Sequence, residues 1–418
     1  MKILVLGAGV VGTATAYYLF RDGHEVEVVE RLTGAGMETS FGNAGGLCPS
    51  FAGPWAAPGM PAKVLKMVMQ ADAPVRFSLR PELRRLSWAR KWLRECNAPR
   101  FRVNKLRMQR VAHYSYACLQ ELMAQTPIAF DFHADGVLQL FQTDAECKLG
   151  NIAANALAEL GIDHKMLDSE AALAIEPALK RASVAVAGAL HLPADASGDS
   201  HAFCQALAAW LASQGVRFHY STRVEQLLHT AGRVTGARTS AGPLNADVTV
   251  VAMGNQAPAL VAPLGIKLPV YPLKGYSITA TVTDAAQAPT VSVMDEHSKV
   301  MISRLGNRIR AAGMAELIGD DLSLKPERKK LLVRTVRGLF PDGIDYENAS
   351  FWAGLRPMTP DGPPILGPSG REGLLLNSGH GSNGWTQACG TAKVVSDLAS
   401  GRKPEIDIEG LTIERYRG

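Results

Sequence analysis

Three glycines and one acidic residue near the start of the chain have the types and spacing of a dinucleotide-binding site. Gly7, Gly9 and Gly12 form a G-x-G-x-x-G pattern, and Glu30 follows about 20 residues later. Gly9 leaves room for the backbone to approach a pyrophosphate, and Gly12 lets a helix lie close on the preceding strand. The carboxylate of Glu30 can accept hydrogen bonds from the ribose hydroxyls. The pattern predicts a bound dinucleotide, with NAD and FAD both open at this point.

Two further glycine-rich stretches favour a flavin. Glu38-Thr-Ser-Phe-Gly-Asn-Ala-Gly-Gly46 carries small and hydroxyl-bearing residues that can donate to a second phosphate and let the backbone pass close to a flat ring. Gly379-His-Gly-Ser-Asn-Gly-Trp385 opens an apolar helix, whose N-terminus would stabilise the negative charge that develops at flavin N1 and O2 on reduction. Either stretch alone could be an ordinary loop, but the two together favour FAD.

The elements predicted around these residues are those of a parallel α/β sheet. Strands are expected at residues 2–6 and 25–30, on either side of a helix that begins at the glycines. Residues 247–253 form a continuous apolar run that ends at Gly254, which is typical of a central parallel strand whose carboxyl end faces a ligand. Residues 373–378 are predicted as one more strand. Strands of the nucleotide-binding domain are therefore predicted in two later parts of the chain, each after a long insertion.

We predict an α/β fold with two interleaved domains. A Rossmann-like FAD-binding domain takes residues 1–50, 191–261 and 346–418. Residues 51–190 and 262–345 form an α+β substrate domain, with several helices and an antiparallel sheet that covers the flavin. The alternation of apolar and polar residues in VYPLKGYSITATV and KVMISRLGNRIRAAGMA is typical of such strands. At 418 residues the chain is long enough for two domains.

Composition limits the class of protein and its partners. Hydrophobic residues make up 47% of the chain and charged residues 20%, as in globular proteins. The net charge of +5 is spread among acidic residues, so no nucleic-acid-binding surface is predicted. The six cysteines show no metal-ligand spacing, and no metal is predicted. No apolar run reaches the ~20 residues that span a bilayer, and a strand at Lys2 leaves no room for a signal peptide, so we expect a cytoplasmic protein.

The segment from Trp55 to Met69 has two interpretations. It mixes Trp, Met, Leu and Val with Lys63 and Lys66, and could lie peripherally on the inner membrane, where quinone is found. An internal amphipathic helix is the commoner explanation of the same pattern.

Six stretches in this order resemble the D-amino-acid oxidase superfamily of FAD-dependent oxidoreductases, above all its bacterial dehydrogenases. They are GAGVVGTATAYYL, ETSFGNAG, PWAAPGMPAK, VYPLKGYSIT, GLRPMTPDGPPILG and LNSGHGSNGW. The likeness covers nearly the whole chain, and GLRPMTPDG joined to SGHGSNGW is far more specific than the glycine pattern. It implies oxidative deamination of free D-amino acids to 2-oxo acids via an imino acid, with a hydride passing from Cα to flavin N5. The electrons would then leave to a respiratory quinone or another acceptor rather than mainly to oxygen.

The resemblance also implies which residues contact a noncovalent FAD. A cysteine that holds the flavin in sarcosine-oxidase-like relatives is replaced here by Met358-Thr359-Pro360, which argues against a covalent bond. The expected FAD contacts are Gly7, Gly9, Val10, Val11, Gly12, Glu30, Arg31, Ser40, Asn43, Ala44, Gly45, Val224, Gly254, Gly379, Gly381, Ser382, Asn383, Gly384, Trp385 and Thr386.

Three residues are predicted to act at the substrate. Arg356 matches the arginine that binds the substrate carboxylate, and its planar guanidinium can make two parallel hydrogen bonds, which a lysine cannot. The apolar residues on either side of Arg356 favour this role over a surface ion pair. Tyr276, or Tyr271 in its place, could cover the substrate or bond its carboxylate, although either ring could instead pack in the core. His380 is expected near the flavin edge as a polar neighbour.

The substrate remains open between several alternatives. Gly46-Leu47-Cys48 and Ser382-Asn383 depart from what is expected of relatives that use D-alanine, and both stretches are predicted to lie by the flavin. A hydroxy-D-proline dehydrogenase of the same build is the first alternative. A glycine- or sarcosine-type oxidase that uses oxygen is the second, and a dinucleotide-binding subunit without chemistry of its own is the third.

Overall fold

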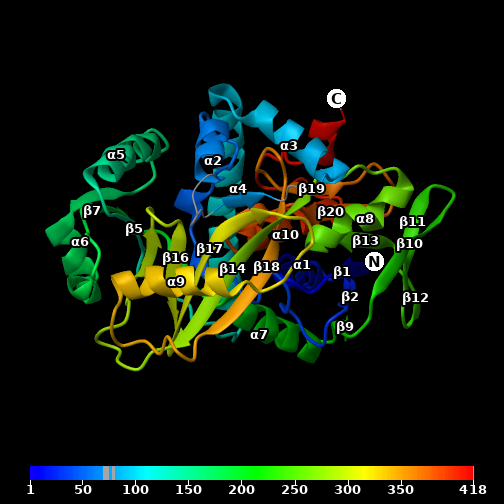
Figure 1. Ribbon diagram of the computed structural model, residues 1–418. Helices are drawn as coiled ribbons and strands as arrows, with labels where there is room; N and C mark the ends of the chain where they lie inside the picture. Colours follow the sequence, from blue (N-terminus) through cyan, green and yellow to red (C-terminus); the bar gives the residue numbers. More distant parts are fainter. Residues whose placement is uncertain (69–74, 78–80, 418) are drawn as a thin grey trace.

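A computed structural model describes residues 1–68, 75–77 and 81–417 of the chain. It contains a mostly parallel sheet and a larger, mostly antiparallel sheet, with helices packed around both (Figure 1). Met69, the end of the segment predicted to contact a membrane, lies outside the described residues. Within these ranges, no helix is long and apolar enough to cross a bilayer.

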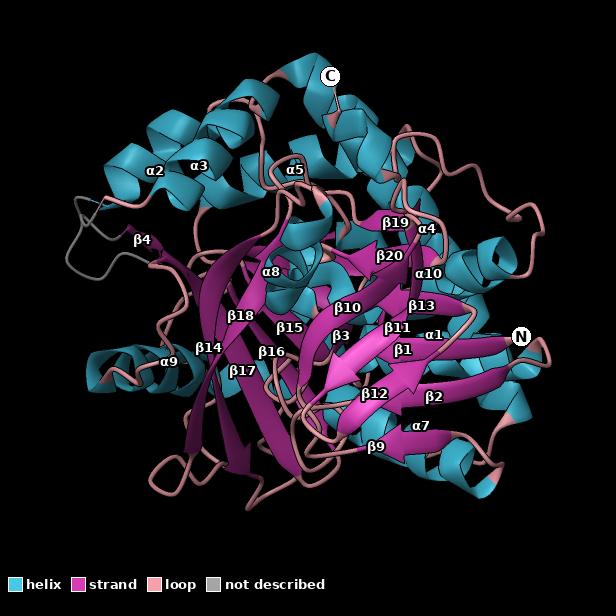
Figure 2. Cartoon of the chain, turned by 90° about the vertical axis from the view of Figure 1, so that its right-hand side faces the viewer, coloured by secondary structure: helices cyan, strands magenta, loops and turns pink. Residues whose placement is uncertain are grey.

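The mostly parallel sheet has six strands and carries the glycine pattern at the end of its strand β1 (Figure 2). β19 pairs antiparallel with β20, and the other neighbours pair in parallel. Nearly all residues of β1 and β2 are buried, because a parallel sheet is covered on both faces. In spatial order the strands are β19 (Ile365–Pro368), β20 (Leu374–Ser378), β13 (Val248–Val251), β1 (Lys2–Leu6), β2 (Glu25–Val29) and β9 (Arg217–His219).

Two helices beside this sheet, α7 and α10, both pack against the helix α1. The apolar residues of α1 and α10 share one core cluster with Ile3 and Val5 of β1. The side chain of Asp199 begins α7 by accepting hydrogen bonds from the N–H groups of His201 and Ala202, as capping residues do. The helices are α1 (Val10–Arg21), α7 (Ser200–Ser213) and α10 (Gly384–Ala399).

The second sheet has nine strands and lies against the carboxyl ends of the parallel strands. β14 is central to the site, because it pairs antiparallel with β18 on one side and with β17 on the other. β15 pairs in parallel with β5, and β4 in parallel with β17. The strands are β18 (Ser350–Met358), β14 (Tyr271–Thr281), β17 (Arg308–Leu317), β16 (Val300–Leu305), β15 (Ser292–Asp295), β5 (Val137–Phe141), β7 (Gly188–Leu192), β6 (Lys165–Asp168) and β4 (Val75–Phe77).

One face of this second sheet is closed by α9 (Pro326–Leu339), which lies against β14, β16 and β17 (Figure 1). The helix buries Leu332, Val336 and Leu339 in one core cluster with Tyr276 and Ile278 of β14. The opposite face of the sheet is therefore the one that can face a ligand.

The remaining elements surround these two layers. α4 packs against α10, and α2 and α3 lie side by side at one end of the molecule in both views (Figure 1, Figure 2). The other helices are α2 (Met60–Val68), α3 (Leu83–Glu95), α4 (Ala98–Gln125), α5 (Asp144–Ala158), α6 (Ser169–Ile175) and α8 (Ala257–Val261). The other strands are β10 (Val224–Thr230), β11 (Arg233–Thr239) and β12 (Gly242–Asn245) in one small sheet, with β3 (Gly46–Leu47) and β8 (Ala196–Ser197) in another. Short 3₁₀ turns are η1 (Pro49–Phe51), η2 (Pro177–Arg181), η3 (Gly254–Gln256), η4 (Ala262–Leu264), η5 (Gly381–Asn383) and η6 (Ile413–Tyr416).

The predicted fold class, a Rossmann-like sheet interleaved with an antiparallel sheet, is confirmed. The division into domains stays a prediction. Residues 346–418, assigned above to the FAD-binding domain, supply β19 and β20 to the six-stranded sheet but also β18 to the nine-stranded sheet. The pairing of β18 with β14 carries Arg356 into the layer that was expected to hold the substrate.

Candidate active site

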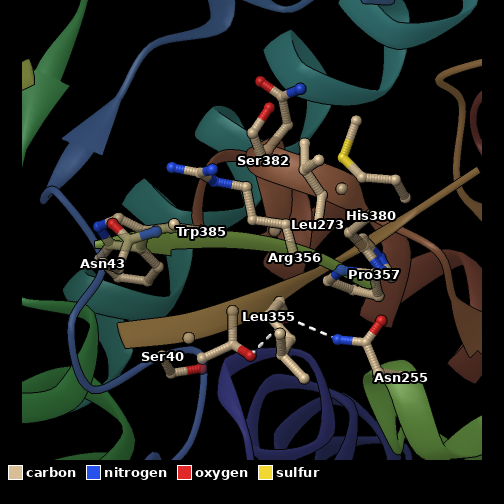
Figure 3. A pocket seen from close by; sticks show the side chains of 18 of the residues that line it. Ser40, Asn43, Asn255, Leu273, Leu355, Arg356, Pro357, His380, Ser382 and Trp385 are labelled. Atoms are coloured by element: carbon tan, nitrogen blue, oxygen red, sulfur yellow. Dashed lines mark hydrogen bonds between the residues drawn. The ribbon is translucent and has the colours of Figure 1, made fainter. Parts of the chain in front are cut away.

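A cavity of about 1240 Å³ lies between the carboxyl ends of the parallel strands and the free face of the nine-stranded sheet. Loops after β1, β2, β13 and β20 form one side of its wall, which is where open α/β sheets bind ligands. Residues of β14, β17 and β18 form the other side. Segments far apart in the sequence thus meet at one site (Figure 3).

The glycines after β1 form a cradle that side chains would fill. Gly7 has a φ of +100°, and a Cβ there would lie 2.7 Å from the carbonyl oxygen of Ala252. A Cβ on Gly12 would lie 1.9 Å from the carbonyl oxygen of Gly7. Gly9 is the N-cap of α1 and has no side chain to cap it, which leaves N–H groups of the first turn for a phosphate. The backbone here has the shape that a pyrophosphate requires.

The Glu30 carboxylate is fixed at the end of β2 by two backbone donors. The N–H of Ala8 donates to its Oε2 at 2.9 Å, and the N–H of Leu32 donates to its Oε1 at 2.9 Å. Arg31, the next residue, forms an ion pair with Glu38. The carboxylate therefore lies beside the glycine cradle, a position that suits the predicted hydrogen bonds to a ribose.

The loop after β2 connects the two sheets. The N–H of Val10 donates to Ser40 Oγ at 3.0 Å, which ties the loop to the start of α1. Thr39 Oγ1 donates to the carbonyl oxygen of Leu355 in β18 at 2.8 Å. Asn43 Oδ1 accepts from the N–H of Gly45 at 2.8 Å and shapes the turn. The small residues predicted to lie by a flavin therefore line the cavity between the sheets.

Most of the predicted cofactor contacts line the cavity. The exceptions are Gly12, Gly45 and Gly379, which shape the backbone behind its wall; Gly45 and Gly379 have φ angles of +89° and +76°. The contacts with FAD themselves stay predictions. The lining residues are Gly7, Gly9, Val10, Val11, Glu30, Arg31, Ser40, Asn43, Ala44, Val224, Gly254, Gly381, Ser382, Asn383, Gly384, Trp385 and Thr386.

His380 lines the cavity as a buried, neutral group. Its Nε2 is 3.0 Å from Thr391 Oγ1 of α10, and only 3% of the residue is exposed. Burial lowers the pKa of His380 to about 3, because the imidazolium would lose its hydration. Its role as a polar neighbour of the flavin edge stays a prediction.

Arg356 reaches from β18 across β14 to β17. Its Nη1 donates to the carbonyl oxygen of Met314 at 2.8 Å, and its Cζ is 6.0 Å from the centre of the Trp55 ring. Burial lowers the pKa of Arg356 to about 10, which still leaves the guanidinium charged at neutral pH. Among the residues that the structure describes, no carboxylate pairs with this charge. A partly buried cation without a carboxylate partner can bind an anion.

Tyr276 does not turn its hydroxyl to the cavity, which speaks against the predicted bond to the substrate carboxylate, whereas the predicted cover of the substrate by its ring stays a prediction. Side chains alternate along β14, and Leu273, which pairs with Arg356, shares the cavity face. Tyr276 borders the cavity but lies on the other face, where its hydroxyl donates to Glu316 Oε2 at 2.9 Å. Tyr271, the alternative, donates to Glu82 Oε2 at 2.7 Å.

Sequence reasoning missed the apolar wall beside Arg356. Leu273 and Met358 lie on the same face of the sheet, and Trp88 of α3 donates from its Nε1 to the carbonyl oxygen of Met358 at 2.9 Å. The alternation along β18 places Met358 on the same face as Arg356, but only the pairing of β14 with β18 adds Leu273 to that face. No local pattern marks Trp88, because α3 is brought to the site only by tertiary packing.

The residues around the cavity fit a dinucleotide with a flat ring. Besides the glycine cradle, three buried polar atoms on the cavity wall lack a hydrogen-bond partner among the described residues: Ser200 Oγ, Asn255 Oδ1 and Asn377 Oδ1. Buried polar groups rarely stay without partners, so these atoms are available to a polar ligand. Cavity size, cradle and unpaired polar atoms together suit FAD.

Comparisons with known proteins identify the family. Residues 2–398 match the family model DAO, described as FAD dependent oxidoreductase. A protein of Methylobacterium nodulans named D-amino acid dehydrogenase is 49% identical over 417 residues, which cover 100% of this chain and 99% of that protein. A D-amino acid dehydrogenase of Cereibacter sphaeroides is 48% identical over 416 residues, or 100% and 95% of the two chains.

Solved structures show the same fold at lower sequence identity. Glycine oxidase from Geobacillus kaustophilus has a TM-score of 0.78 at 23% identity and covers 100% of both chains. L-proline dehydrogenase from P. horikoshii has a TM-score of 0.72 at 20% identity, over 100% of this chain and 97% of that one. The resemblance to the bacterial dehydrogenases of the D-amino-acid oxidase superfamily and the prediction of an FAD enzyme are confirmed. The chain belongs to the DAO family of FAD-dependent oxidoreductases, and FAD is its cofactor.

Proposed function

We propose that this enzyme oxidises free D-amino acids to 2-oxo acids and ammonia by way of an imino acid. The observation that carries the proposal is the charged, partly buried guanidinium of Arg356, which has no carboxylate partner in the described part of the chain and lines the same cavity as the glycine cradle. The names of the relatives support the D configuration. When bound, FAD supplies the two-electron oxidant for the amine.

Arg356 binds and orients the substrate. One of its N–H groups is held by Met314, and the remaining donors can make two parallel hydrogen bonds to a carboxylate. Such a pair fixes the position of Cα and gives the rate advantage of proximity. Leu273, Met358 and Trp88 keep the surroundings apolar, which strengthens the attraction between the two charges.

His380 is not the base in this proposal. Its low pKa and its contact with Thr391 keep it neutral without a driving force to take a proton near pH 7. The substrate amine loses its proton to water before it is oxidised. The test is the formation of 2-oxo acid and ammonia with a dye as acceptor, from D-alanine and from L-alanine. Product from L-alanine alone would contradict the proposal.

The FAD is held without a covalent bond. Met358-Thr359-Pro360 follows Arg356 where the sarcosine-oxidase-like relatives carry their cysteine. Among the described residues, Cys48 is the cysteine that lines the cavity. Burial raises the pKa of the Cys48 thiol well above its ordinary value, and a protonated thiol is a poor nucleophile. Denaturation by acid should therefore release the yellow colour into the supernatant, whereas a covalent flavin would precipitate with the protein.

We further propose that the electrons leave to a quinone at a membrane surface on which the protein lies peripherally. The outer face of α3 exposes Leu83 and Leu86 by 86% and 57%, and Leu93, which also borders the cavity, is 53% exposed. Its inner face supplies Trp88 and Trp92 to the cavity wall. The exposed leucines alternate with the basic residues Arg84, Arg90, Lys91 and Arg94. Such a helix suits an anionic lipid surface, and it lies where the cavity approaches the outside.

Vesicle binding tests the membrane contact. The FAD-loaded enzyme should sediment with anionic vesicles and less with neutral ones, and Leu83→Ser with Leu86→Ser should reduce the bound fraction. Leu149→Ser with Ile152→Ser, in the equally exposed pair on α5, is the matched control. An equal decrease of the vesicle-bound fraction with both pairs would show that any exposed apolar residue matters and would exclude α3 as the specific contact.

The electron acceptor is tested separately. Rapid formation of hydrogen peroxide without a dye would favour an oxidase over a dehydrogenase.

Hydroxy-D-proline remains the second candidate substrate. Gly46, Cys48, Ser382 and Asn383, at the two stretches that depart from the D-alanine-using relatives, all line the cavity. The comparison of kcat/KM for cis-4-hydroxy-D-proline with that for D-alanine decides between the two.

A further inference from the structure

The guanidinium of Arg356 is held at a β-bulge in β17. Lys274 of β14 pairs with Glu316, but Tyr276 pairs with Gly313, so Met314 and Ala315 together oppose Gly275. The extra residue of a bulge is released from the regular ladder and can be used to redirect a group. Here the carbonyl of Met314 accepts the hydrogen bond from Arg356 Nη1.

The bulge is strained. Met314 has a φ of +64°, a left-handed conformation that is unfavourable for a residue with a side chain. Such a conformation persists only when the surrounding structure imposes it. The source of this constraint lies on the opposite face of the same strands.

Tyr276 and Glu316 bridge the bulge on that opposite face. The pair Tyr276–Gly313 lies on one side of the bulge, and the pair Lys274–Glu316 lies on the other. The hydroxyl of Tyr276 donates to Glu316 Oε2 at 2.9 Å across the bulge. Glu316 Oε1 accepts from Arg328 Nε of α9 at 2.8 Å, and Lys325 Nζ lies 3.6 Å from Oε2. The Glu316 side chain is fully buried, so its contacts are exchanged with water only if the strand opens.

We propose that Tyr276 and Glu316 are positioning residues for the substrate carboxylate. Their hydrogen bond closes the two sides of the bulge, keeps the carbonyl of Met314 on the cavity face, and so sets the orientation of Arg356. This inference rests on the proposed function in one respect, that Arg356 binds a carboxylate. It gives Tyr276 a role at the site without contact with the substrate.

The test uses Tyr276→Phe in the FAD-loaded enzyme. The substitution removes only the hydroxyl and keeps the ring stacked on Phe351, whose centre is 5.5 Å away. The Kd of benzoate, measured by the change in flavin absorbance, and the KM of D-alanine should rise about fivefold, the scale of one lost hydrogen bond, with unchanged FAD content. Tyr346→Phe is the control, because Tyr346 is buried in the same cluster and its hydroxyl donates to the carbonyl of Phe340, far from the bulge in the sequence.

A double-mutant cycle separates positioning from general loss of stability. Lysine at position 356 lacks the fork that the bulge orients, so Tyr276→Phe should change the Kd of benzoate by less than about twofold in the Arg356→Lys background. An equal effect in both backgrounds, or no effect in the wild-type background, would overturn the proposal. If Tyr276→Phe does not retain FAD, Glu316→Gln takes its place in the same cycle.

The outcomes also distinguish this proposal from the proposed function. Wild-type enzyme that binds benzoate but is reduced by no D-amino acid would refute the function and leave the positioning role to stand. Wild-type enzyme that is reduced by D-alanine, with Tyr276→Phe equal to it in Kd and KM, would refute the positioning role alone.

Discussion

The guanidinium of Arg356 lies directly over the backbone of Gly275. A Cβ on Gly275 would lie 2.6 Å from Cζ, Nη1 and Nη2 of Arg356, closer than any real contact. Arg356 on β18 can reach Met314 on β17 only because the strand between them, β14, has no side chain at this position. The absence of a side chain is thus part of the carboxylate site.

Gly275→Ala should displace the guanidinium and weaken substrate binding. The added methyl group removes the path to Met314, and the KM of D-alanine should rise about tenfold or more, the order of a lost charge-assisted hydrogen bond. FAD content should be unchanged, because the nearest atoms to the added methyl group belong to Arg356 and not to the glycine cradle. Gly53→Ala is the control in the same cavity wall, because the nearest atom to its added Cβ would be the carbonyl oxygen of Phe51 at 3.8 Å.

Arg356→Lys should separate charge from geometry. Lysine keeps the positive charge but cannot make two parallel hydrogen bonds, so kcat/KM for D-alanine should fall about tenfold to a hundredfold. Arg356→Ala should lower it further. Steady-state kinetics with a dye acceptor measures both, and equal activity of Arg356→Lys and wild type would show that the fork is not used.

Gly12→Ala should abolish FAD binding. The new Cβ would lie 1.9 Å from the carbonyl oxygen of Gly7, a backbone atom that cannot move aside without distorting the cradle. Overpacking of this kind costs about 1–3 kcal/mol of stability. The purified variant should lack the visible flavin absorbance. Gly338→Ala in α9 should keep it, because the nearest atom to its added Cβ would be a side-chain methyl carbon of Val184 at 3.3 Å.

His380 should make the enzyme sensitive to acid. Burial lowers its pKa to about 3, while the unfolded chain has the ordinary value of 6.5, so only the unfolded state binds the proton between these values. The free energy of unfolding therefore decreases as the pH is lowered, by about 2 kcal/mol from pH 6.5 to pH 5. Urea unfolding of His380→Gln should show a smaller loss over these pH values. The same loss as in wild type would contradict the assignment, and His229→Gln, at an exposed position, is the control.

The nucleotide half of the site could be predicted from the sequence because its causes are local. Gly7, Gly12 and Glu30 lie within or directly beside one strand-helix-strand unit. The neighbouring residues predict the strands, the turn and the helix of this unit. Arg356 was recognisable from its apolar neighbours and from the resemblance that they carry. Its hydrogen bond to Met314 across the neighbouring strand β14 could not be predicted from the sequence.

The substrate half depends on strand pairing, which no local pattern fixes. The alternation along β14 shows that Leu273 and Tyr276 face opposite ways, but not which of them faces the cavity. That choice follows from the partner strands and from the bulge at Met314. Trp88 lies 270 residues before Met358 in the chain, and only packing places the two side by side.

The central claim is that the cavity holds a flavin over which Arg356 binds a D-amino acid. Anaerobic mixing of the FAD-loaded enzyme with D-alanine or L-alanine, followed by the visible flavin absorbance, tests it most directly. We predict that D-alanine bleaches the flavin, that L-alanine does not, and that Arg356→Ala requires far more D-alanine for the same bleaching. Bleaching by L-alanine alone, or an Arg356→Ala variant that responds like wild type, would contradict the account.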